Sequence, residues 1–157
     1  MNSQRDPNEG RRLDGVVIFG GKLTFLIPHD WVENEDAAGE DYYSYSEPNA
    51  LSGWLRASLI SMQGVADPKQ RLESAFADRP FEVDNETGNY VACWTKDTLQ
   101  DGEALQIHYW KVGRIVPPDT VREAIFSYTA TASAANSDVT LRDIKLLSML
   151  VRKAKLS

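Results

Sequence analysis

The chain has 157 residues, of which 42% are hydrophobic, 10% aromatic and 25% charged, and its formal net charge is −6. This composition is typical of one folded globular domain and excludes a disordered chain. An acidic chain also argues against nucleic-acid binding, which normally requires a broad basic face.

The first residues predict a lead that takes no part in the core. Residues 1–13 are almost entirely polar, with nothing apolar before Leu13, so we expect a mobile lead over 1–13 and a single domain over 14–157. The lead lacks the basic start and apolar run of a secretory signal, and no apolar run approaches the roughly 20 residues that cross a bilayer. With only one cysteine, Cys93, the sequence favours a cytoplasmic protein without membrane contact.

The next part of the chain predicts strands. Residues 16–28 favour a β-hairpin with a two-glycine turn, because glycine adopts the positive φ angles of a tight turn without strain. Pro28 ends the second strand, since it has no N–H to donate. Residues 42–46 form a short β-prone run, and residues 54–62 alternate apolar and polar side chains with the period of a strand.

A short helix should follow these strands. Asp67 is a suitable N-cap, and it precedes a proline at the first helical position and a glutamine at the third. Leu72, Ala75 and Phe76 give this helix a narrow apolar face, and Pro80 prevents its continuation.

The remaining chain predicts an antiparallel meander and a second helix. The expected strands cover 81–83, 89–96, 104–116 and 123–132, with a turn at Asp101-Gly102. In the third of these strands, apolar side chains fall on both faces, so both faces of the sheet should be at least partly covered. The second helix begins near residues 136–138, and cations occupy its last turns, where the helix dipole favours them.

The apolar side chains of the second helix share one broad face, which we expect to lie on the sheet with Met149 left outside. The predicted face consists of Leu141, Ile144, Leu147, Leu150, Val151 and Ala154. The order of elements indicates the α+β class, with an antiparallel β-sheet flanked by helices in an α/β/α sandwich. A β-hairpin starts the fold and a helix ends it.

Sequence motifs for catalysis are not evident. There is no phosphate loop, nucleophile elbow, paired-cysteine motif or H-E-x-x-H, so we expect no catalytic residue, no metal and no cofactor. A metal site on His29 and His108 would need nearby carboxylates, and the simpler interpretation is one loop histidine and one sheet histidine. Cys93 should pack as a small hydrophobe.

Acids and aromatics gather between residues 30 and 54. Seven acids and no Lys or Arg lie between Asp30 and Glu47, and interfaces over-use Tyr and Trp. Core packing explains part of the aromatic cluster. We predict that the rest forms a binding surface for a protein with a basic or amphipathic surface. The predicted partner-binding residues are Trp31, Glu33, Glu35, Asp36, Asp41, Tyr43, Tyr45 and Trp54.

The stretch FLIPHDW, residues 25–31, and the order of elements together resemble the PsbP-like fold family. This family includes Ran-binding Mog proteins and the bacterial DcrB-like and Eag-type secretion chaperones. Its N-terminal hairpin strand commonly ends in a Pro-x-x-Trp turn, which Pro28 and Trp31 match. The resemblance covers about residues 14–155 and implies an antiparallel sheet between helices and a protein that binds other proteins without catalysis. Eag-type members often act as dimers, so a homodimer stays open.

Three functional hypotheses follow. The leading hypothesis is a cytoplasmic bacterial adaptor or chaperone-like protein, linked to secretion through the resemblance. The second is an immunity protein that neutralises a toxin, because such proteins are often small, acidic and free of catalytic groups. The third is a small enzyme or ligand-binding protein whose site assembles from His108, Glu103 and the tyrosines.

Overall fold

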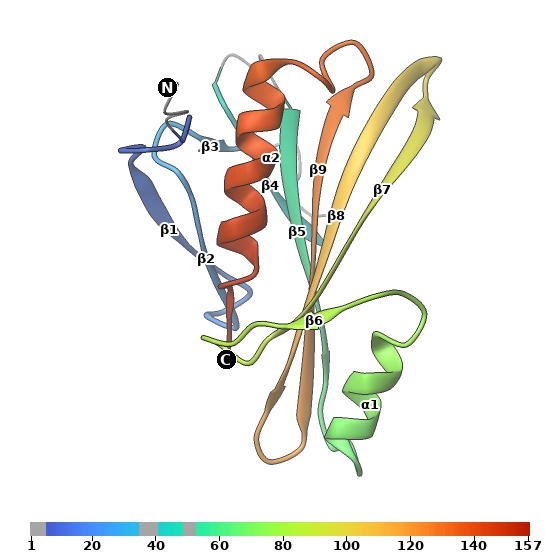
Figure 1. Ribbon diagram of the computed structural model, residues 1–157. Coiled ribbons are helices and arrows are strands. Elements are labelled where there is room, and N and C mark those ends of the chain that lie inside the picture. Colours follow the sequence, from blue (N-terminus) through green and yellow to red (C-terminus); the bar gives the residue numbers. More distant parts are fainter. Residues whose placement is uncertain (1–5, 35–40, 49–52) are drawn as a thin grey trace, which may run out of the picture.

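A computed structural model of the chain describes residues 6–34, 41–48 and 53–157, which form two antiparallel sheets and two helices (Figure 1). The small sheet has, in spatial order, β1 (Leu13–Ile18), β2 (Leu23–Pro28) and β10 (Lys155–Leu156). The large sheet has, in spatial order, β3 (Val32–Glu33), β4 (Tyr42–Ser46), β5 (Gly53–Met62), β9 (Thr120–Thr131), β8 (Glu103–Val116), β7 (Tyr90–Gln100) and β6 (Glu82–Val83). The helices are α1 (Pro68–Ala75) and α2 (Asp138–Val151).

The predicted N-terminal hairpin is present as β1 and β2. Its turn is longer than the two glycines, because Phe19 joins Gly20 and Gly21 at positive φ before β2 begins at Leu23. Every second side chain of the hairpin faces the interior, as a strand period of two requires. These inward-facing residues are Val16, Ile18, Leu23, Phe25 and Ile27.

The main core lies between one face of the large sheet and a layer made by the hairpin and α2 (Figure 1). Phe25 of the hairpin meets Phe126 of β9 edge to face, with ring centroids 5.1 Å apart. Trp31 stacks on Tyr128 of β9 at 6.2 Å. Aromatic pairs of this kind add to the hydrophobic burial that holds the two layers together.

Helix α1 packs on the opposite face of the large sheet. Its N-cap is Asp67, as predicted, because the Asp67 carboxylate accepts a hydrogen bond from the backbone N–H of Gln70 at 3.1 Å. Leu72 and Phe76 are buried against β8 and β9 and form a second apolar cluster there. The eight residues of α1 cover one end of this face only, where Gly113 provides the space for the Phe76 and Leu72 side chains.

Strand β7 is longer than the sequence predicted. The expected end was residue 96, whereas β7 continues to Gln100. Asp101 and Gly102 both have positive φ, with values of 52° and 79°, and they form a two-residue turn. Because the turn is this short, β7 and β8 stay paired up to Gln100 and Glu103, the residues on either side of it. This pairing keeps the polar end of β7 in the sheet.

Helix α2 begins at the predicted cap, and the face that it buries is rotated from the predicted one. Leu147, Val151 and Ala154 are buried, as predicted. The Ser137 hydroxyl accepts a hydrogen bond from the backbone N–H of Thr140, and Met149 is exposed, as expected. Leu141, however, is 51% exposed, whereas Thr140 and Asp143 are fully buried. The helix can bury Asp143 because its carboxylate is paired with arginine.

The described part of the N-terminal lead contacts α2. The Asn8 side-chain amide donates a hydrogen bond to the carbonyl of Arg142 at 3.1 Å. The Arg11 guanidinium donates to the Asp143 carboxylate at 2.8 Å, and the Tyr128 hydroxyl approaches the same carboxylate at 3.4 Å. The sequence did not predict these contacts, because Arg11 lies in a polar stretch and its partner Asp143 is 132 residues away in the chain.

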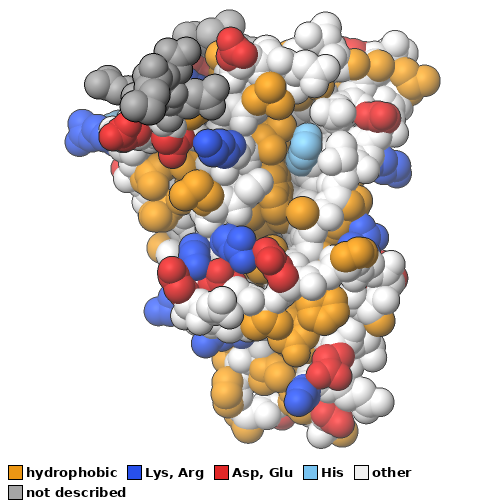
Figure 2. All heavy atoms as spheres, viewed as in Figure 1, with side chains coloured by type: hydrophobic (Ala, Val, Ile, Leu, Met, Phe, Trp, Pro, Cys, Tyr) orange, Lys and Arg blue, Asp and Glu red, His pale blue; other side chains and the backbone are white. Residues whose placement is uncertain are grey.

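A cluster that we name the Asp84 clamp fixes the end of α2 to the strands β6 and β7. It consists of Asp84, Asn89, Arg152 and Lys153. Figure 2 shows Lys, Arg, Asp and Glu side chains that gather near the level at which α2 ends in Figure 1. The buried Asp84 carboxylate accepts hydrogen bonds from Lys153 at 2.9 Å and Arg152 at 3.0 Å. The hydrogen bond from Lys153 holds the pKa of Asp84 well below its usual range.

The amide of Asn89 completes this clamp. It donates hydrogen bonds to the carbonyls of Arg152 and Ala154, which follow the last turn of α2. Backbone carbonyls at a helix end lack partners within the helix, so Asn89 satisfies groups that the fold buries. The chain then runs into β10, where Leu156 pairs with Leu23 of β2.

Candidate binding face

Two of the predicted partner-binding aromatics lie in the main core. Trp31 is 6% exposed and Tyr45 is 5% exposed, which corrects the expectation that they line a contact surface. The backbone N–H of Trp31 donates to the carbonyl of Pro28, so the Pro-x-x-Trp turn places the indole against Tyr128. Tyr45 faces the interior because of its place in the strand alternation, and its ring lies 6.0 Å from Phe25.

The predicted acids have different positions. The Tyr45 hydroxyl donates a hydrogen bond to the Glu33 carboxylate at 3.4 Å. Burial, followed by the charge of Glu33, raises the pKa of Tyr45 far above its ordinary value. Asp41 is exposed just before β4, whereas Glu35 and Asp36 lie outside the described residues.

The other two predicted aromatics lie on opposite faces of the large sheet. Tyr43 is half-buried on the core side, with its ring 5.1 Å from that of Phe19. Trp54 is half-buried on the opposite side, because it alternates with Gly53 and Leu55, which are buried. The predicted aromatic cluster is therefore divided between the core and a separate surface.

That surface is the part of the large sheet that neither helix covers, and we call it the open face. One row of directly paired residues crosses it, with Arg56 opposite Ser127 and Tyr109 opposite both Ser127 and Trp94. The side chains that define the open face are Tyr42, Trp54, Arg56, Trp94 and Tyr109 from the strands, and Arg79 from the segment after α1.

Arginine side chains on the open face lie over aromatic rings. The Arg79 guanidinium is 3.6 Å from the centre of the Trp94 ring, and Trp94 stacks on Tyr109 at 5.1 Å with an interplanar angle of 12°. Arg56 lies 4.7 Å above the Tyr42 ring. Each such contact contributes about 0.5–1 kcal/mol at an exposed site and restricts the arginine side chain. The open face therefore presents oriented guanidinium groups, which suit carboxylates.

The prediction from the sequence missed both arginines of this face and three of its four aromatics, since only Trp54 was among the predicted partner-binding residues. Alternation within β7 and β8 places Trp94 and Tyr109 on definite faces, but only the strand register shows that they are neighbours. Arg79 comes from a non-strand segment beyond α1, so no periodicity connects it with Trp94.

His108 does not form the predicted alternative site with Glu103. The two residues lie on the same strand, five positions apart, which corresponds to about 16 Å. The imidazole stacks on Trp110 at 6.3 Å, and its Nδ1 atom is 3.5 Å from the Thr95 hydroxyl. Within the described residues, no carboxylate lies within hydrogen-bond distance of His108.

Burial lowers the pKa of His108 below its ordinary value of 6.5. As the pH falls below 6.5, the unfolded chain therefore takes up the His108 proton first, and the protein loses stability until the pH reaches the lowered pKa. The His108→Gln variant should show a smaller fall in Tm between about pH 7.5 and about pH 5.5 than the parent. An NMR titration that gives His108 a pKa at or above 6.5 would contradict this prediction.

The remaining candidate residues also lie apart from one another. The prediction that Cys93 packs as a small hydrophobe is wrong, because Cys93 is exposed on β7, where no other strand of the described residues pairs with the outer edge. His29 is paired with Asp14 at 2.9 Å on the surface. Among residues 6–34, 41–48 and 53–157, no group of three His, Cys, Asp or Glu side chains could hold a metal ion. No helix within these ranges is long and apolar enough to span a membrane.

Comparisons with known proteins identify the fold. No protein-family model matches the chain, and no curated protein sequence matches it significantly. The Ran-binding protein Mog1p of Saccharomyces cerevisiae matches with a TM-score of 0.52 and 14% identity, over 93% of this chain and 96% of Mog1p. The chain has the Mog1-like fold. This result confirms the α+β class and the resemblance to the PsbP-like and Mog-type fold family.

Two further structures share the Mog1-like fold. LpqN of Mycobacterium tuberculosis, described as involved in cell envelope biogenesis, has a TM-score of 0.52 and 13% identity, over 97% of this chain and 94% of LpqN. A protein of Bacteroides thetaiotaomicron VPI-5482 has a TM-score of 0.59 and 17% identity, over 91% of this chain. The match covers 48% of the Bacteroides protein, so this chain spans about half its length. At these identities the comparisons establish the fold alone.

Proposed function

We propose that this chain is a non-catalytic protein-binding adaptor that holds an acidic surface of a partner protein on its open face. The stack of Arg79 on Trp94 and Tyr109 is the observation that carries the proposal. Arg, Trp and Tyr are the side chains most enriched among residues that dominate binding energies. An arginine that is already held on a ring also loses less side-chain freedom when it binds a carboxylate.

The charge of the open face supports an acidic partner. Arg56 and Lys96 are exposed there, and neither has an ion pair with another described residue. Arg79 has only a long contact of 3.4 Å, with Asp78. This proposal reverses the basic partner that the sequence suggested, because the described side chains that define the open face are arginines and aromatics.

The Mog1-like fold is compatible with this role. Mog1p is described as a Ran-binding protein, so one protein of this fold binds another protein. No residue of Mog1p is transferred to this chain at 14% identity. We infer only that a protein of this fold can use its surface for recognition, and the adaptor role predicted from the sequence is retained as a proposal.

A charge-reversal experiment tests this function. The Arg56→Glu/Arg79→Glu double variant should lose the partner that the parent captures from its native lysate, as read by mass spectrometry. The matched control is Lys155→Glu, which changes an exposed cation on β10 and should retain the partner. The captured complex should also weaken as salt increases. If the double variant folds, as shown by circular dichroism, and still captures every partner of the parent, the proposal is wrong.

A further inference from the structure

Strand β7 forms an edge of the large sheet over most of its length (Figure 1). The short β6 pairs only with Tyr90 and Val91. From residue 92 to residue 100, no other strand of the described chain pairs with the outer side of β7. Such an edge presents backbone N–H and C=O groups that another extended chain can pair with.

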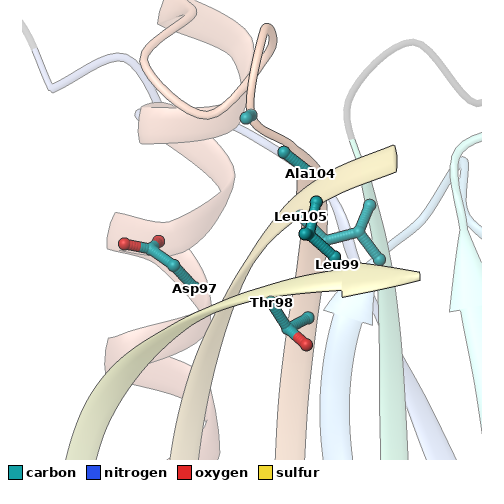
Figure 3. Close-up of a pocket in the computed structure, with 6 residues that line it drawn as sticks. Asp97, Thr98, Leu99, Ala104 and Leu105 are labelled. Atoms are coloured by element: carbon teal, nitrogen blue, oxygen red, sulfur yellow. The ribbon is translucent and has the colours of Figure 1, made fainter. Parts of the chain in front are cut away.

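An apolar pocket opens at the end of this edge. It has a volume of about 600 Å³ and is lined by Asp97, Thr98, Leu99, Ala104, Leu105 and Ala132. Figure 3 shows Leu99 and Leu105 close together at the ends of β7 and β8. Leu99 is 73% exposed, the highest value among the large hydrophobic side chains of the described chain. An apolar side chain from a bound segment would cover it.

The side chains along the edge have a definite order. Trp94, Lys96 and Thr98 are at alternate positions, so they project toward the open-face side of the sheet. Lys96 is exposed and has no ion pair within the described residues. A strand added to this edge would therefore meet an aromatic ring, a cation and the pocket at successive alternate positions.

A second copy of the chain would meet like charges in two central registers of this edge. A two-fold axis that joins two copies of β7 into one antiparallel sheet must pass beside a single residue, because directly paired side chains share a face. An axis beside residue 96 sets Lys96 against Lys96, and an axis beside residue 97 sets Asp97 against Asp97. Like charges directly opposite each other are destabilising, whereas a foreign segment with an acid opposite Lys96 forms an attractive pair.

We propose that the β7 edge binds an extended peptide segment as an added strand, with a carboxylate opposite Lys96 and an apolar side chain on each side of it at alternate positions. One apolar side chain fills the pocket beside Thr98 and its cross-strand partner Leu105, and the other contacts Trp94. Main-chain pairing supplies affinity, and the alternate side chains supply selectivity. This second mode of binding goes beyond the proposed function, because it adds main-chain pairing at the β7 edge and does not use Arg56, although it shares Trp94 and Lys96 with the open-face side of the sheet.

The probe is the capped peptide Thr-Leu-Thr-Glu-Thr-Leu-Thr, which presents the same pattern in either strand direction. In ¹⁵N NMR spectra of the full chain, it should shift the amide signals of residues 92–100. The matched peptide with Lys in place of Glu should bind about fivefold more weakly or worse, the expected effect of one charged cross-strand pair. A version of the probe with N-methyl groups on every backbone amide should not bind, since neither of its edges has N–H groups to donate to β7.

Variants separate this site from the open face. Lys96→Glu should reverse the preference, so that the Lys peptide binds more tightly than the Glu peptide, and Leu99→Ser should weaken both. Both side chains are exposed, so the variants should fold. The Arg56→Glu single variant should bind the probe like the parent, because β9 and β8 separate Arg56 on β5 from the β7 edge. This control makes failure here distinguishable from failure of the adaptor proposal. Absence of binding at millimolar peptide, or shifts confined to another surface, would overturn the inference.

Discussion

Replacing Gly53 with alanine should lower the free energy of unfolding by about 3 kcal/mol, at the upper end of the usual cost of overpacking. A Cβ atom at this position would overlap the backbone carbonyl oxygen of Thr129 and would lie 2.9 Å from the Tyr128 ring. Tyr128 is fully buried, and Thr129 belongs to the strand that pairs with β5, so neither group can move freely. Urea denaturation followed by tryptophan fluorescence measures the change.

Gly15→Ala is the matched control for this prediction. Gly15 also lies in a strand, but a Cβ atom there would have its nearest neighbour, in the Leu26 side chain, at 4.0 Å, an ordinary contact. We expect its effect to be neutral or slightly stabilising, since alanine restricts the unfolded chain more than glycine does. Equal losses of stability for Gly53→Ala and Gly15→Ala would show that the contacts of the added Cβ atom with Thr129 and Tyr128 do not determine the loss at Gly53.

Replacing Asp143 with alanine should also lower the free energy of unfolding by about 3 kcal/mol, the lower end of the range for a broken buried ion pair. Asp143 is fully buried, and its carboxylate lies 2.8 Å from Arg11 and 3.2 Å from Arg142. Without this carboxylate, the guanidinium groups of Arg11 and Arg142 have no negative charge to pair with at the edge of the core. Both arginines keep some contact with solvent, which limits the loss. Chemical denaturation provides the value.

Asp78→Ala is the control for the Asp143 variant. Asp78 also pairs with an arginine, Arg79, but its side chain is 67% exposed, and exposed pairs contribute about 0–1 kcal/mol. An equally small effect for Asp143→Ala would indicate that water replaces the carboxylate at the buried site. The protection of the Arg11 amide from hydrogen exchange should fall in the Asp143 variant, because Arg11 is held there by this carboxylate.

Local sequence patterns predicted most of the secondary structure. The Asp67 cap, the turn at Asp101-Gly102 and the alternation in β5 depend on residues close in the chain, so they can be read without the fold. The short strands β3 and β10 were not predicted. Each has two residues, too few to show a strand period, and each is defined by its pairing: β3 with the following strand β4, and β10 with the distant strand β2. The rotated face of α2 was missed for a similar reason, since Arg11 compensates the buried Asp143 from the other end of the chain.

The candidate site was harder to predict than the fold. The binding surface was predicted in residues 31–54 because acids and aromatics are frequent there. In the structure, Trp31 and Tyr45 face the core, and strand alternation places Trp54 on the other face of the sheet. The open face combines side chains from β4, β5, β7 and β8 with Arg79, and it depends on which strands become neighbours. No local pattern contains that information, because the two halves of the sheet are joined by the pairing of β5 with β9, which begin at residues 53 and 120 and are separated by α1 and three strands.

The position of β10 has a consequence for the order of folding during synthesis. The small sheet joins the N-terminal hairpin to a strand that follows α2, and β2 lies between them. A ribosome therefore releases β1 and β2 long before their third strand, while the inward faces of Phe25 and Ile27 still lack most of the core that covers them. Until α2 emerges, the nascent hairpin exposes apolar surface of the kind that general chaperones recognise.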